Sequence, residues 1–97
     1  MNKHAKIIRR IREKLWAGQY EFADPHFAQE MINDGLSFAE IETAMAKGKI
    51  NDIFTDDIRG VRYEVVGKAT DGRQIAIICR IKENGNVLFI TTWEIYE

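Results

Sequence analysis

Apolar residues near the start of the chain recur at the spacing of an amphipathic helix. Ile8, Ile11 and Leu15 are three and four positions apart, and basic residues occupy most of the positions between them. Gly18 follows and is a typical helix end. The pattern predicts an N-terminal basic helix over about 3–17 that buries one apolar stripe.

Two further helices are predicted by their start signals. Asp24 offers a capping side chain, and Pro25 after it suits the first helical position, where its missing N–H costs nothing. Ser37 and Glu40 form a capping box, in which each side chain satisfies free amides at the helix start. The third helix then runs to about Lys47 and buries its apolar side.

The second half of the chain changes to the alternating pattern of strands. Asp71-Gly72 and Asn84-Gly85 are typical hairpin turns, so the strands that they join are antiparallel neighbours. Residues 20–22 fit either a short strand or an extended link. The predicted strands cover residues 50–54, 62–69, 73–82 and 87–95.

This order of elements predicts an α+β fold. Helices come first and strands second, and one face of an amphipathic sheet needs a cover. We therefore expect three helices packed on one face of an antiparallel sheet of three to four strands. No repeat or Ser/Gly/Pro-rich linker interrupts the pattern, so residues 1–97 are predicted to form a single domain.

Composition limits the class of protein and the compartment in which we expect it. The chain is 45% hydrophobic and 30% charged, as in ordinary globular proteins. No apolar run approaches the ~20 residues of a membrane span, and no secretory signal is evident. Cys79 is the one cysteine, which excludes an internal disulfide and a cysteine zinc site. We expect a cytoplasmic protein that has no membrane contact and no bound metal or cofactor.

The charges are segregated along the chain. Residues 1–20 carry six Lys or Arg and one acid, whereas residues 21–57 carry two Lys and nine acids. The net charge of −1 therefore hides local surfaces of opposite sign. The basic helix could track a phosphate backbone or dock on the acidic region of another copy, which would give a homodimer. The alternative is an ordinary solvated helix face.

Several short strings between Phe22 and Thr92 stand in a recognisable order. They are Phe22-Ala23-Asp24-Pro25-His26, a helix ending in Met31, Asp34-Gly35-Leu36-Ser37, Glu40-Ile41, Ala44, Lys47-Gly48-Lys49-Ile50, Arg62-Tyr63, Gly67, Asp71-Gly72-Arg73 and Ile90-Thr91-Thr92-Trp93. In these strings the chain resembles a bacterial family of small domains of unknown function that is related to the RelE and MqsR toxins of toxin–antitoxin systems.

The resemblance implies a RelE-like two-layer fold, an antitoxin protein as partner, and cleavage of messenger RNA by a metal-independent endoribonuclease. Two positions depart from the family pattern, because Glu30 and Asp34 stand where arginines are common. Acids at these positions repel RNA. They favour the alternative hypothesis of a non-catalytic protein-binding module that keeps the toxin-like fold.

Metal-free RNA cleavage uses the 2′-hydroxyl of the substrate as nucleophile. The protein must supply a proton acceptor, a proton donor and cations that stabilise the charged phosphorane. Alternation along the strands predicts that Arg62, Lys68 and Arg80 emerge together from the face that the helices leave uncovered. These three residues are the catalytic candidates on the sheet. The alternative is that they are the solvated half of an amphipathic sheet.

Four more residues complete the candidate site. His26, at a helix start, could act as general acid or base or bind a phosphate, or it could be a structural histidine. Arg73, in a hairpin, is a candidate RNA contact. Tyr63 and Trp93 could stack on bases, although aromatic residues on strands more often belong to the core.

Overall fold

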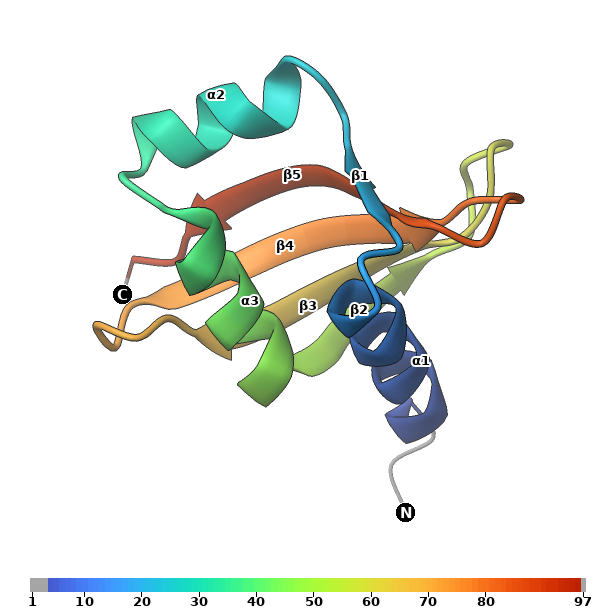
Figure 1. The fold of residues 1–97 in the computed structure, drawn as a ribbon, viewed down its shortest axis with the longest axis horizontal. Helices are drawn as coiled ribbons and strands as arrows, with labels where there is room; N and C mark the ends of the chain where they lie inside the picture. The colour runs from blue at the N-terminus through green and yellow to red at the C-terminus, as the bar shows by residue number, and fades with distance from the viewer. Residues whose placement is uncertain (1–3, 97) are drawn as a thin grey trace.

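The computed structural model describes residues 4–96 as three helices and a mixed five-stranded sheet (Figure 1). The helices are α1 (Ala5–Trp16), α2 (His26–Asn33) and α3 (Phe38–Lys47). The strands are β1 (Tyr20–Phe22), β2 (Lys49–Phe54), β3 (Arg62–Lys68), β4 (Gln74–Ile81) and β5 (Val87–Glu94). Their order in the sheet is β1-β5-β4-β3-β2. Within the described part of the chain, no helix has the length and apolar character to cross a membrane.

The predicted sheet of three to four antiparallel strands was wrong. The sheet has five strands, and β1 lies at its edge, parallel to β5, with Tyr20 opposite Val87. β1 has only three residues, too few to show an alternating pattern, and its partner lies far along the chain with no turn between them. The antiparallel β3–β4–β5 meander is confirmed.

The helix starts were predicted with mixed success. The Ser37 hydroxyl accepts a hydrogen bond from the Glu40 amide at 3.3 Å, so the predicted cap at Ser37 is confirmed. Within residues 4–96 the reciprocal bond of a capping box is not formed, because the Glu40 carboxylate accepts from the Ser37 hydroxyl instead of the Ser37 amide. The predicted cap at Asp24 was wrong: Pro25 is the capping residue of α2, and no side chain bonds to the free amides. α1 is confirmed from Ala5 onward, and Lys3 lies outside the described residues.

All three helices pack on one face of the sheet. α2 lies on β5, α3 on β3 and β4, and α1 beside α3 (Figure 1). Val65, Ile75, Ile77 and Cys79 point into this core and are fully buried. Burial raises the pKa of the Cys79 thiol to about 12, because a thiolate is poorly solvated there. Cys79 is therefore a core residue and not a nucleophile.

α3 approaches β3 at a seam of two glycines. A Cβ atom at Gly67 would lie 2.1 Å from the Ala44 carbonyl oxygen, and one at Gly48 would lie 2.6 Å from the same atom. Both distances are far below van der Waals contact, and the obstacle is backbone that cannot rotate away. The glycines therefore set how closely the C-terminal end of α3 lies to the sheet.

Glu21 joins β1 to the turn between β4 and β5. Its carboxylate accepts hydrogen bonds from Lys82 Nζ at 2.8 Å, Asn86 Nδ2 at 2.9 Å and Asn84 Nδ2 at 3.1 Å. These donors, with Lys82 as the largest cause, lower the pKa of Glu21 from 4.5 to about 2. The short edge strand is thereby tied to the rest of the sheet.

We expect Glu21→Gln to reduce the acid sensitivity of the fold. A depressed carboxyl pKa stabilises the protein above the unfolded value of 4.5, and the stabilisation is lost as the pH falls toward about 2. Urea unfolding measured across this range should show a smaller pH dependence in the variant. Glu83→Gln is the control, because Glu83 makes no ion pair within residues 4–96. Equal pH dependence in wild type and Glu21→Gln would contradict the prediction.

Candidate functional site

The face of the sheet opposite the helices is organised in rows across the strands. Lys49, Val66, Ala76 and Trp93 stand directly opposite one another on β2, β3, β4 and β5. At ~4.8 Å between neighbouring strands, this row is about 14 Å long. It has a lysine at one end, an exposed tryptophan at the other and two small apolar residues between them.

The predicted cations on this face do not form one group. Arg62 and Lys68 lie at opposite ends of β3, about 20 Å apart at ~3.3 Å per residue. The row between them includes two acids, Asp52 and Glu64. Arg80 lies on β4 near the Arg62 end, because Tyr63 pairs with Cys79. The structure therefore separates Lys68 from both arginines.

Arg62 is occupied by neighbouring groups. Its guanidinium carbon lies 5.3 Å from the centre of the Phe54 ring, and its Nη2 lies 3.3 Å from Asp56 Oδ1. Its Nε is buried, 3.6 Å from Asp57 Oδ2, and has no hydrogen-bond partner among residues 4–96. Arg80 donates to the Arg59 carbonyl at 3.2 Å. Arg62 in particular is compensated by acids and is poorly placed to receive a phosphate.

Arg73 holds several parts of the fold together. Its guanidinium contacts the carboxylates of Asp71, Glu40 and Glu94 and donates to the Asp34 and Gly35 carbonyls. These partners belong to the β3–β4 turn, the start of α3, the end of β5 and the α2–α3 connection. Arg73, which we predicted to contact RNA, thus acts in the described fold as a clasp between these four segments.

The remaining predicted residues lie on different surfaces. His26 starts α2 on the helix-covered side, with Nε2 3.9 Å from Glu30 Oε1, and so lies across the sheet from Lys68. Tyr63 is half-buried and packs against the core. Trp93 alone of the two aromatics lies on the uncovered face, where it is exposed. His26 therefore joins none of the sheet cations.

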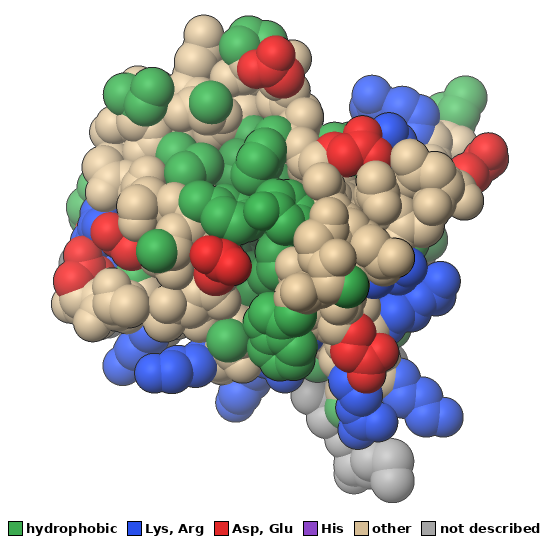
Figure 2. Space-filling model, in the orientation of Figure 1, with side chains coloured by type: hydrophobic (Ala, Val, Ile, Leu, Met, Phe, Trp, Pro, Cys, Tyr) green, Lys and Arg blue, Asp and Glu red, His purple; other side chains and the backbone are tan. Residues whose placement is uncertain are grey.

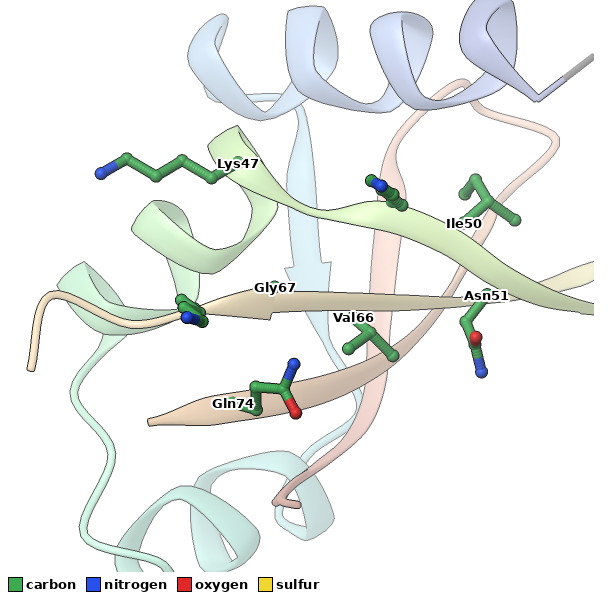
Figure 3. A pocket seen from close by; sticks show the side chains of 8 residues that line it. Lys47, Ile50, Asn51, Val66, Gly67 and Gln74 are labelled. Atoms are coloured by element: carbon green, nitrogen blue, oxygen red, sulfur yellow. The ribbon is translucent and has the colours of Figure 1, made fainter. Parts of the chain in front are cut away.

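Lys68 belongs to a lysine-lined pocket at the edge of the sheet. We call this the lysine pocket: a hollow of about 460 Å³ lined by Lys47, Lys49, Ile50, Asn51, Val66, Gly67, Lys68 and Gln74. Figure 3 shows Lys47 at the end of α3, above the strands that carry Val66 and Gln74. No acid lines the pocket, and within residues 4–96 no ion pair holds any of the three lysines.

Local structure explains why the three lysines line one pocket. Lys47 ends α3 and Lys49 begins β2, with only Gly48 between them. Arg12 of α1 donates to the Met45 carbonyl at 2.8 Å and to the Gly48 carbonyl at 2.6 Å. These two bonds satisfy carbonyls at the end of α3 that have no partner in the helix. The helix end is thereby held in place beside β3.

The arrangement is suited to binding an anion. Three ammonium groups that have no acid partner within residues 4–96 attract a phosphate, and the Gln74 amide can donate a further hydrogen bond. The Asn51 amide already donates to the Glu64 carboxylate at 2.6 Å. Within residues 4–96 no three His, Cys, Asp or Glu side chains gather as a metal site. Our sequence interpretation gave no role to Lys47 and Lys49. The sequence feature that could have identified them is a pair of lysines on either side of the glycine that joins a helix to a strand.

One family matches most of the chain. It is described as a domain of unknown function, DUF4258, and it covers residues 24–94, from the residue before Pro25 to the end of β5. α1 and β1 lie before the matched segment. No curated protein and no solved structure shows a significant match. Because the family matches well over half of the chain, the chain belongs to the DUF4258 family.

Proposed function

We propose that the domain binds single-stranded RNA through the lysine pocket and the adjoining row of the sheet. The observation that carries the proposal is that Lys47, Lys49 and Lys68 line one pocket and have no acid partner within residues 4–96. Backbone phosphates dominate affinity for nucleic acids, and lysines supply the countercharge. The row that begins at Lys49 leads along the sheet to Trp93, which can stack on a base.

The geometry favours a single strand over a duplex. Trp93 is exposed on the uncovered face, where its side chain can stack on an unpaired base. A duplex hides its bases inside the helix, so Trp93 would have no base to contact. The acids Asp52 and Glu64 bound the site on one side and direct the strand along the Lys49–Trp93 row.

Cleavage is the second candidate function. It is the activity implied by the resemblance to RelE and MqsR toxins, and it is supported by the place of Lys68 within the proposed RNA site. The other predicted catalytic residues support it less. His26 lies across the sheet, and Arg62 is paired with acids. We therefore propose RNA binding as the function. An antitoxin protein as partner is supported only by the resemblance to the toxins.

Replacing Lys47, Lys49 and Lys68 together with alanine should weaken RNA binding about a hundredfold, at roughly 1 kcal/mol for each lost contact. The measurement is fluorescence anisotropy of a labelled single-stranded RNA over a series of salt concentrations. Each phosphate contact on a single strand contributes about −0.7 to the slope of log affinity against log salt. The slope should therefore become shallower by about 2 in the triple variant.

A matched control removes the same charge elsewhere. Lys6, Arg9 and Arg10 are exposed on α1, and replacing all three with alanine lowers the net charge equally. Equal losses of affinity in the two triple variants would show that RNA responds only to total charge, and this would refute the lysine pocket as the site. Trp93→Ala should weaken RNA binding without changing the salt slope.

Binding and cleavage are separated by incubating the protein with RNA in EDTA. Intact RNA together with saturable binding is the expected result. Fragments with 2′,3′-cyclic phosphate ends, lost in Lys68→Ala, would replace the binding proposal with the toxin mechanism. Neither binding nor cleavage would refute both candidates.

A further inference from the structure

A second hollow lies on the helix side of the molecule. It is an apolar groove of about 390 Å³ between β1, α2 and α3, and we call it the aromatic groove. Its lining residues are Phe22, Asp24, Phe27, Ala28, Met31 and Phe38. Figure 2 shows hydrophobic side chains gathered in the middle of this face, among the helices. None of these residues takes part in the proposed RNA site.

Contacts between aromatic rings form the walls of the groove. Phe22 stacks on Phe27 at 5.4 Å between ring centres and meets Phe38 edge-on at 5.2 Å. Phe27 is fully buried, whereas Phe22 remains 41% exposed. A preformed apolar surface of this kind lowers the entropic cost of binding a partner. Exposed clusters of apolar residues commonly mark interaction sites.

Two acids flank the groove. Asp24 lines it, and Glu42 lies one helical turn after Phe38 on the same side of α3. Both are exposed, and neither makes an ion pair among residues 4–96. The surrounding stretch of chain, residues 21–57, carries nine acids and two lysines. A partner that fits must therefore bring an apolar anchor with positive charges beside it.

The chain itself carries such an element on α1. The inner stripe of α1 is buried, but its outer side exposes three basic residues, Lys6, Arg9 and Arg10, and one acid, Glu13. Trp16, at the end of the same helix, is 64% exposed. Tryptophan and arginine are the residues most enriched at the energetic centres of protein interfaces. The outer side of α1 thus has the chemistry that the aromatic groove requires.

We propose that two copies of this chain associate, with Trp16 of each copy seated in the aromatic groove of the other. The basic residues of α1 would then face Asp24 and Glu42 of the opposite copy. A two-fold arrangement makes both contacts at once, so each copy contributes one anchor and one groove. The segregation of charge along the sequence, basic at residues 1–20 and acidic at residues 21–57, gives the interface its complementarity.

The first test is the oligomeric state of the full chain by sedimentation equilibrium. We expect a dimer that weakens as salt rises from about 0.05 to about 0.5 M, because screening shortens the reach of the charges. Trp16→Ala should weaken dimerisation about thirtyfold, as for an interface hot spot. Tyr96→Ala is the control, since Tyr96 is also an exposed aromatic but lies outside α1 and the groove.

A second test exchanges the charges. Arg9→Glu with Arg10→Glu gives a copy whose helix and groove are both acidic, and Asp24→Lys with Glu42→Lys gives a copy in which both are basic. Each variant alone should be monomeric, because like charges meet at both contacts. An equimolar mixture should restore the dimer, because each acidic surface then meets a basic one.

Three outcomes would overturn the proposal. If the wild type stays monomeric at low salt, the aromatic groove does not bind a second copy, and its partner must be a different protein. A dimer that is unchanged in Trp16→Ala and in both charge variants would place the interface elsewhere. Charge variants that are monomeric both alone and when mixed would show that the two surfaces do not meet. A cooperative urea unfolding transition verifies that each variant is folded.

Discussion

Gly67→Ala should lower the free energy of unfolding by about 3 kcal/mol or more, beyond the usual cost of overpacking a core. The added methyl group would lie 2.1 Å from the Ala44 carbonyl oxygen, so α3 must move away from β3. Gly67 does not have the left-handed backbone that only glycine adopts easily, so alanine brings no backbone strain of its own. The whole loss of unfolding free energy therefore reports how closely α3 approaches β3 at Gly67. Urea unfolding measures this loss.

Gly18→Ala separates this effect from backbone conformation. Gly18 has a φ of +76°, and a Cβ there meets nothing within 4 Å. Alanine at Gly18 should cost about 1–2 kcal/mol through conformation alone. If Gly67→Ala proved less harmful than Gly18→Ala, the seam between α3 and β3 would be looser than described. The Gly67 variant should also bind RNA more weakly, because Lys47 moves with α3.

Arg73→Met should lower the free energy of unfolding by about 2–3 kcal/mol, since it leaves three carboxylates and two carbonyls without their shared partner. The side chain is 25% exposed, so solvent screens part of the loss. Methionine retains much of the apolar stem, which restricts the change to the charge and hydrogen bonds. Chemical denaturation at neutral pH provides the measurement.

Arg59 provides a matched control for Arg73. Each arginine follows an aspartate by two residues, and each donates through both its amide and its guanidinium to that aspartate. Arg59 is 74% exposed and takes no carboxylate partner beyond Asp57 in the described chain. Arg59→Met should therefore cost about 0.5 kcal/mol or less. Similar losses in both variants would contradict the clasp at Arg73.

Local signals in the sequence were sufficient for much of the fold. The cap at Ser37 and the turns at Gly72 and Gly85 depend on residues that are neighbours along the chain, and all three were predicted correctly. β1 could not be predicted in the same way. Its strand character comes from pairing with β5, far along the sequence, and three residues carry no periodicity of their own.

The candidate site shows a different limit. Alternation along β3 correctly predicts that Arg62 and Lys68 share a face, but a shared face does not bring residues together. Whether a cation is free depends on acids from other segments, such as Asp56 and Asp57 beside Arg62. Lys47 and Lys68 line the same pocket because α3 folds back along β3, a tertiary contact that sequence spacing does not encode.

β2 forms the open edge of the sheet, and its irregular pairing has a consequence for solubility. The register shifts between Ile50 and Asp52, so the strand bends at Asn51. A bent edge with an exposed lysine is a poor template for a strand from another molecule, which discourages aggregation. A substitution that removes the charge of Lys49 should therefore ease pairing of this edge with a strand of another molecule, independently of any effect on the proposed RNA site.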